Sequence, residues 1–110
     1  MRLQVKGKNL EVSDSIRSYA EQKLHKLSKQ LGEAVQVELE LTVERNPSIR
    51  DCQVAEATVF TKGHSLRARA ATSDMRASID GLTDKLLREI KEYREKRRRE
   101  PRRKAERSNT

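Results

Sequence analysis

Aromatic residues and cysteine are scarce in this sequence. Its 110 residues include two tyrosines, one phenylalanine and no tryptophan, and Cys52 is the only cysteine. A single cysteine excludes a disulfide framework and a cysteine-based metal site. Because only 34% of the residues are hydrophobic, the chain has room for one small aliphatic core in one domain.

Long apolar segments are absent as well. No run approaches the roughly eighteen residues that a membrane-spanning helix needs. The first residues, "MRLQVKGKNLEV", alternate polar and apolar and lack the apolar stretch of a signal peptide. We therefore expect a cytoplasmic protein.

The residue patterns of catalytic sites are missing too. There is no glycine-rich phosphate loop, and Cys52, His25 and His64 stand isolated in the sequence, without a nucleophile–base pair. We expect both histidines to be solvated surface residues, and Asp80 and Asp84 to serve helix capping or solvation. The sequence thus predicts no enzyme, catalytic residue, metal site, cofactor or small-molecule substrate.

Positive charge is what the chain has in excess. The formal net charge is +8, and residues 91–110 hold ten basic and four acidic side chains, whereas residues 1–90 are close to neutral. Such asymmetry predicts an anionic partner, either a nucleic acid or a membrane surface. A charged tail that only keeps the protein in solution would show the same composition.

Hydrophobic periodicity places a strand, a helix and a second strand in the first half. "RLQVK" alternates as a strand does. Ser13 is a suitable N-cap for a helix over residues 14–31, and Gly32 is suited to end it. Residues 35–44 alternate strictly, which predicts a strand with one buried face. The apolar stripe of the helix consists of Ile16, Ala20, Leu24, Leu27 and Leu31.

Two further strands follow a turn at Pro47, which cannot donate to a sheet ladder. Residues 52–61 and 65–71 alternate on either side of a short glycine-containing loop at residues 62–64, a pattern typical of a hairpin. The side chains expected to face the core are Ala55, Ala57, Val59, Leu66, Ala68 and Ala70.

The last helix is predicted to begin after a cap at Ser73 or Asp74. Its apolar stripe ends at Tyr93, and the basic run that follows has nothing to pack against, so we expect the helix to fray before Pro101. We expect a folded domain over residues 1–99, followed by a basic disordered tail or the start of a linker over residues 100–110.

This order of elements predicts an α+β fold. A strand–helix–strand start implies a right-handed crossover and a parallel first pair. Because the strands have one apolar face, both helices must cover that face of a four-stranded sheet, which gives a two-layer sandwich with the order β-α-β-β-β-α.

Exposed cations on the two predicted helices form the candidate RNA-binding site. Most of them point away from the apolar stripes, while Lys23 lies at the edge of its stripe. Two helices on one sheet face would present them to one polyanion. Simple solvation of the helix faces explains the same pattern. The other sheet face offers only Phe60 for base stacking, which favours recognition of RNA backbone and shape. The candidate residues are Lys23, Lys26, Lys29, Lys85, Arg88, Lys91 and Arg94.

Two segments of the sequence stand out, "DMRASIDGLTDKLLREI" in the last predicted helix and "VKGKNLEVSDSIRSYAEQKLHKL" near the start. Both resemble a known family, the bacterial ribosome hibernation promoting factors and ribosome-associated inhibitors. "DMRASIDGLTDKLLREI" is similar to the second-helix signature of that family. "VKGKNLEVSDSIRSYAEQKLHKL" resembles its Gly-x-Asn turn, helix cap and Lys-x-x-Lys-Leu helix. The similarity covers about residues 1–99. One departure is Arg76, which stands where relatives often carry an aromatic residue.

The resemblance implies a sandwich likened to double-stranded-RNA-binding domains. It also implies binding to the small ribosomal subunit in the channel used by messenger and transfer RNA, and inhibition of translation under stress or in stationary phase. Lys29, Lys91 and Arg94 add charge without a firm family counterpart. The residues that face ribosomal RNA, carried over by position, are Lys23, Lys26, Lys85 and Arg88.

Other functions remain open at this point. A protein–protein module would have a dimerisation domain or a sigma factor as its partner, and a general double-stranded-RNA binder would need no ribosome. Long forms of the family add a linker and a dimerising domain that pairs ribosomes. We therefore expect either a short form or the N-terminal part of a long form, with ribosome pairing only in the second case.

Overall fold

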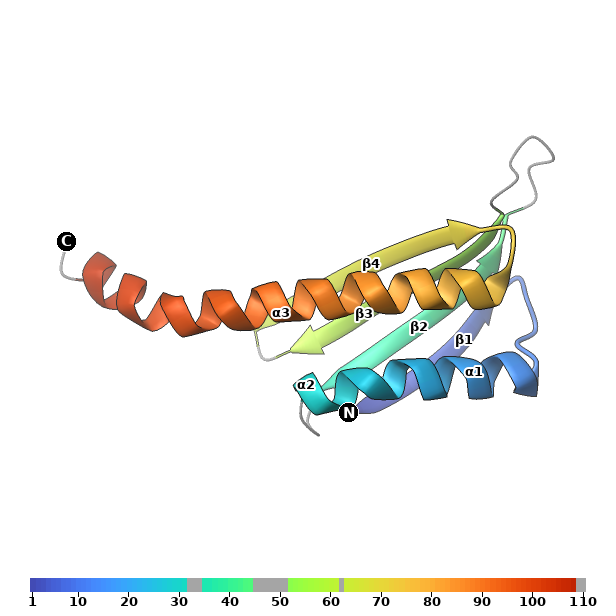
Figure 1. The fold of residues 1–110 in the computed structure, drawn as a ribbon, viewed down its shortest axis with the longest axis horizontal. Coiled ribbons are helices and arrows are strands. Elements are labelled where there is room, and N and C mark those ends of the chain that lie inside the picture. Colours follow the sequence, from blue (N-terminus) through green and yellow to red (C-terminus); the bar gives the residue numbers. More distant parts are fainter. Residues whose placement is uncertain (32–34, 45–51, 62, 109–110) are drawn as a thin grey trace.

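The computed structural model describes residues 1–31, 35–44, 52–61 and 63–108. They form two layers, with the helices packed on one face of a four-stranded sheet (Figure 1). The α+β class, the order of elements and the two-layer arrangement predicted from the sequence are confirmed. The strands are β1 (Arg2–Lys8), β2 (Gln36–Val43), β3 (Gln53–Thr61) and β4 (His64–Thr72). The helical elements are α1 (Asp14–Leu24), the 3-10 turn η1 (His25–Leu27), α2 (Ser28–Leu31) and α3 (Met75–Ser108).

The sheet has the strand order β1-β2-β3-β4. β1 pairs with β2 in parallel, as the crossover through α1 requires, and the other two pairs are antiparallel. Thr61 lies directly opposite His64, so the hairpin between β3 and β4 is one residue shorter than expected. Gly63 has a φ of 76°, a left-handed conformation that glycine adopts without steric cost.

Strict alternation along the strands buries one face of the sheet. Ala55 lies opposite Ala70, and Ala57 lies opposite Ala68, all four buried under α3. Their small side chains let the helix lie close to the sheet, and Gly81 of α3 sits against the Ala70 methyl. The largest fully buried side chains of the core are Leu24, Leu27, Leu39, Leu41, Ile79, Leu82, Leu86 and Ile90.

The first helical segment spans the predicted residues but is not one continuous α-helix. Ser13 caps α1, since its Oγ accepts a hydrogen bond from the Ile16 N–H at 3.2 Å. The chain tightens into the 3-10 turn at His25–Leu27 and continues as α2 to Leu31. The predicted helix end at Gly32 and the predicted turn at Pro47 lie outside the described residues.

The last helix is longer than predicted. Asp74 is its cap, with Oδ2 accepting a hydrogen bond from the Ala77 N–H at 3.1 Å. The helix then runs past the end of the sheet and through Pro101 to Ser108 (Figure 1). The expected fraying before Pro101 is therefore wrong, because Arg, Lys, Glu and Ala on both sides of that proline are favourable helix formers. The domain boundary at residue 99 stays a prediction.

None of the helices in the described part of the chain is long and apolar enough to cross a membrane.

Candidate nucleic-acid interface

The seven cations expected to bind RNA all come from the helical layer. The first helical segment and α3 lie side by side on the same face of the sheet (Figure 1). Lys23 is half-buried and the other six side chains are exposed. Lys23 belongs to α1, Lys26 to η1 and Lys29 to α2, while Lys85, Arg88, Lys91 and Arg94 belong to α3.

A polar network joins α1 to α3 around Asp80. The Tyr19 hydroxyl donates to Asp80 Oδ1 at 2.7 Å, and Lys23 Nζ lies 3.3 Å from the same oxygen. Lys23 and Arg76 both lie over the Tyr19 ring, 5.6 and 5.4 Å from its centroid. Arg76 also donates to Ser15 Oγ at 2.6 Å. Arg76 is thus part of the helix–helix contact.

This network sets the protonation of its members. The hydrogen bond from Tyr19, followed by the hydrogen bond and charge of Lys23, lowers the pKa of Asp80 below its ordinary value. The hydrogen bond to Asp80 raises the pKa of Tyr19 and also that of Lys23. Lys23 therefore stays charged, but the Asp80 carboxylate already neutralises much of that charge.

Two other candidate cations of the first helical segment, Lys26 and Lys29, form no such pair with the described residues. Both are exposed, and no carboxylate in the described part of the chain lies in ion-pair distance of either. With respect to these residues, both can bind a phosphate without giving up a partner.

The α3 cations divide between the two sides of the helix. Lys85 Nζ donates to the backbone oxygen of Arg69 at 2.8 Å, and Lys85 and Arg88 line a hollow beside β4. On the other side, Arg94 donates to Gln30 Oε1 at 2.7 Å, and Lys91 lines the same hollow as these two residues. The structure brings Lys91 and Arg94 next to the first helical segment, whereas Lys85 lies at the far edge of α3.

The opposite face of the sheet differs in charge. There Lys6 lies 4.0 Å from Glu40, and Arg69 pairs with Glu44 at 2.7 Å. Phe60, 43% exposed, is the large hydrophobic residue on this face. Among the described residues, ion pairs thus involve Lys6 and Arg69 on the open face and Lys23 on the helical layer.

Two aromatic contacts were not predicted from the sequence. His64, expected to be merely solvated, stacks on Tyr93 of α3 with ring centroids 5.1 Å apart and an interplanar angle of 9°. Tyr19 joins α1 to α3 through Asp80. Their partners lie 29 and 61 residues away, so no local spacing could have revealed them.

Comparison with known proteins places the chain in a family. Residues 3–98 match the family described as "Sigma 54 modulation protein / S30EA ribosomal protein", and the chain belongs to that family. A ribosome hibernation promotion factor of Picosynechococcus sp. is 38% identical over 97 residues, which are 87% of this chain and 50% of that protein. The ribosome hibernation promoting factor of Escherichia coli K12 is 33% identical over 96 residues, covering 87% of this chain and 96% of that protein. The chain thus spans about half the length of some curated relatives and nearly all of others.

Solved structures agree on the fold. The N-terminal domain of Thermus thermophilus Protein Y superposes with a TM-score of 0.71 at 28% identity, over 84% of this chain and 99% of that one. A ribosomal subunit interface protein from Coxiella burnetii gives the same TM-score at 21% identity, over 86% of this chain and 98% of that one. The second likeness concerns the fold alone.

Proposed function

We propose that this chain is a cytoplasmic ribosome hibernation factor that binds the small ribosomal subunit. In this proposal the helical layer contacts ribosomal RNA in the channel used by messenger and transfer RNA. The folded domain excludes both RNAs by occupying their path and so inhibits translation under stress or in stationary phase. No bond is made or broken, so the chain acts as a binding protein and not as an enzyme.

One observation carries the proposal. Four exposed cations of the helical layer, Lys26, Lys29, Arg88 and Lys91, have no carboxylate within 4.0 Å among the described residues. Phosphates can neutralise such groups and release the counterions around RNA, an attraction that requires no particular base sequence. The names of the relatives, which are ribosome hibernation factors, support the ribosome as the source of that RNA.

The test is co-sedimentation with purified small ribosomal subunits at physiological salt. The double variant Lys26→Glu/Arg88→Glu reverses one cation on each helical segment. We expect it to lose at least about tenfold in affinity, because two phosphate contacts become repulsive. Its Tm should change by only a few degrees, since both side chains are exposed.

The matched control is Lys6→Glu/Lys8→Glu. It changes the net charge by the same amount, but on β1, whose side chains at these positions are exposed and lie outside the helical layer. We expect it to bind subunits nearly as the unchanged chain does. Equal losses in both double variants would show that net charge alone acts and would contradict a helical interface.

Two further outcomes separate the alternatives. Comparable affinity for plain duplex RNA and for ribosomal subunits would favour a general double-stranded-RNA binder. Absence of subunit binding by the unchanged chain would favour a protein–protein module.

A further inference from the structure

The outer edge of β4 is an open strand edge. β4 is last in the strand order, and among the described residues it pairs with β3 alone. Strand edges carry unpaired N–H and C=O groups that can pair with another chain. On this edge, the Arg69 carbonyl accepts a hydrogen bond from Lys85 Nζ at 2.8 Å. That bond shows which way the Arg69 backbone points.

The direction of the Arg69 carbonyl fixes the direction of its neighbours. In an antiparallel pair, residues that exchange hydrogen bonds with the partner alternate with residues that do not. Arg69 points its carbonyl away from β3, so Arg67 and Ser65, two and four positions earlier, do the same. No described residue is hydrogen-bonded to these outward N–H and C=O groups of Ser65 and Arg67, which have the spacing that an added strand requires. At Arg69 the carbonyl is already bonded to Lys85, so the series of open groups ends there.

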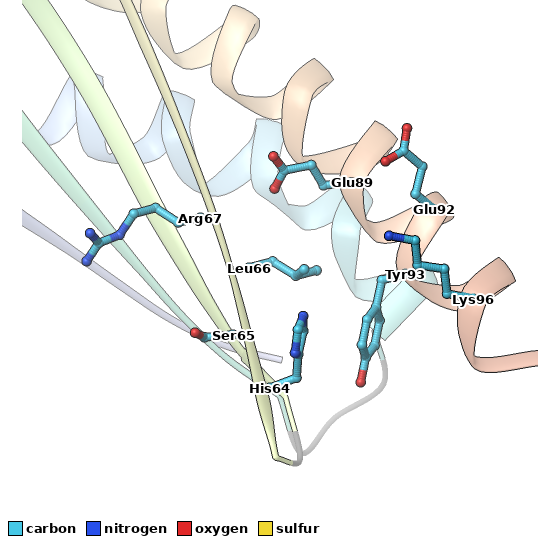
Figure 2. A pocket seen from close by; sticks show the side chains of 8 residues that line it. All are labelled: His64, Ser65, Leu66, Arg67, Glu89, Glu92, Tyr93 and Lys96. Carbon is cyan, nitrogen blue, oxygen red and sulfur yellow. The ribbon is translucent and has the colours of Figure 1, made fainter. Parts of the chain in front are cut away.

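A groove between β4 and α3 accompanies this edge. Two hollows, of about 350 and 440 Å³, lie along it and share Arg67, Glu89 and Glu92 in their walls. Figure 2 shows the first of them, with Leu66 between the strand and the helix and the parallel rings of His64 and Tyr93 at one end. An extended chain lying on the edge would have α3 along one side.

The two sides of this edge favour different side chains. Along an added strand, successive side chains would point alternately to the open face of the sheet and to the side of α3. On the open face they would meet the exposed Arg67, whose guanidinium points away from α3 in Figure 2. On the helix side they would meet half-buried Leu66 and buried Ala68. Acidic residues alternating with aliphatic ones satisfy both sides.

We propose that the edge of β4 is a docking site for an extended acidic–aliphatic segment of another protein, which adds to the sheet as a fifth strand. Backbone hydrogen bonds to Ser65 and Arg67 hold the segment in register. The exposed guanidinium of Arg67 on the open face selects its acidic residues. Of the RNA-binding candidates, Lys85 and Arg88 line this groove, whereas Lys23, Lys26 and Lys29 lie on the first helical segment.

Other occupants fit the groove less well. An RNA strand would bring its phosphates against Glu89 and Glu92 and would leave the backbone donors and acceptors of Ser65 and Arg67 without partners in strand spacing. If a second copy of this chain paired through β4, Arg67 and Arg69 of one copy would lie opposite Arg67 and Arg69 of the other. Like charges directly opposite each other are destabilising.

The test uses the full chain and a fluorescent peptide of about nine residues, the length of β4, in which valine and glutamate alternate. Binding is measured by fluorescence anisotropy at physiological salt. Methylation of alternate backbone nitrogens on the pairing side of the peptide keeps every charge. We expect it to weaken binding by at least about tenfold, since each methyl group removes a strand-to-strand hydrogen bond and blocks close approach.

A variant of the chain tests the same contact from the other side. Ser65→Pro removes one outward N–H without changing charge, and proline is tolerated on strand edges. We expect it to weaken peptide binding about fivefold or more, with Ser65→Ala unchanged and the binding of ribosomal subunits unaffected by either. Peptide-induced shifts of the Ser65 and Arg67 amide signals should accompany binding. If Ser65→Pro does not fold, the methylated peptide and the amide shifts of the unchanged chain test whether the peptide pairs with the edge of β4.

Three results would overturn the proposal: equal binding of the methylated peptide, equal binding of a peptide with lysine in place of glutamate, or no binding at all. Displacement of the peptide by a single-stranded uridine oligonucleotide, with amide shifts at the same residues, would make the groove an RNA site and would also overturn it. None of these results bears on subunit binding through the helical layer, so the two proposals fail separately.

Discussion

Asp80 is a residue that stabilises the fold but weakens the candidate RNA interface. Its carboxylate joins α1 to α3 by accepting the Tyr19 hydrogen bond, and it pairs with Lys23, a candidate RNA contact. The same carboxylate therefore holds the helices together and screens a cation from phosphate.

Asp80→Asn should separate these two effects. We expect the Tm to fall by a few degrees at neutral pH, because an amide is a weaker acceptor and carries no charge. Affinity for RNA should rise by about twofold at low salt, because Lys23 is released from its partner. Thermal melts and subunit co-sedimentation measure the two. Asp84→Asn, one turn further along α3, is the control, and an equal rise in affinity there would assign the effect to net charge.

The lowered pKa of Asp80 also predicts a pH dependence. A carboxyl group whose pKa is lower in the folded state stabilises the fold above its unfolded pKa, about 3.9 for aspartate. That contribution disappears as the pH falls through the folded pKa. Denaturant unfolding should thus show the stability gap between the unchanged chain and Asp80→Asn at pH 7, and the gap should close in acid. A gap that does not narrow as the pH is lowered below the unfolded pKa would contradict ionisation as its cause.

Two glycines test how closely the backbone packs. A Cβ at Gly7 would clash with the Leu10 carbonyl oxygen, so Gly7→Ala should destabilise the fold by about 1–3 kcal/mol or more. At Gly81 the nearest atom is the Ala70 Cβ at 3.5 Å, an ordinary contact. Gly81→Ala should therefore stabilise α3 by about 0.5–1 kcal/mol, the helix-propensity difference. Denaturant unfolding should show a lower free energy of unfolding for Gly7→Ala and a higher one for Gly81→Ala.

At the scale of elements, hydrophobic periodicity predicted the features of the fold that depend on local sequence, namely the helices, the strands and their buried faces. The stripes from Ile16 to Leu31 and from Met75 to Ile90, and the alternation around Leu39 and Ala57, locate the helices and strands of the described part of the chain and their buried faces, but not the 3-10 turn of η1 or the end of α3. The hydrogen bond between Tyr19 and Asp80 and the stacking of His64 on Tyr93 could not be predicted, because they depend on how distant elements are packed. The candidate cations could be placed on the helices, but whether each has a partner, as Lys23 and Lys85 do, depends on the same packing.

The C-terminal part of α3 offers a prediction about the element itself. Residues 97–110 carry seven basic and two acidic side chains, and the last buried residue of α3 among the side chains described, up to residue 96, is Ile90. A chain ending at residue 96 should keep its Tm within a few degrees but bind ribosomal subunits more weakly. A variant of full length with glutamine at the seven basic positions should bind equally weakly. Full affinity in that variant would mean that the length of the helix matters and not its charge.

At the scale of the whole molecule, the open face of the sheet and the helical layer differ in how far their charges are paired. Across the open face, Lys6, Glu40, Glu56 and Arg69 lie side by side on β1 to β4, so acidic residues in the centre are flanked by cations at the edges. This face compensates most of its own charge. On the helical layer, exposed cations such as Lys26 and Arg88 have no carboxylate within 4.0 Å among the described residues, and in the proposed function they meet the phosphates of an external polyanion.

This asymmetry predicts how binding should depend on salt. Each phosphate contact adds roughly 0.7–0.9 to the slope of log affinity against log salt concentration, because counterions are released. Lys26→Gln/Arg88→Gln should therefore lower the slope for subunit binding by about 1.5, because two phosphates are no longer neutralised by the chain. Lys6→Gln/Lys8→Gln, with the same change in net charge, should leave the slope nearly unchanged. The slope reports the number of phosphates that the chain neutralises by direct contact, whereas net charge acts at long range. Equal slopes for the two variants would therefore mean that the polyanion does not bind to the helical layer.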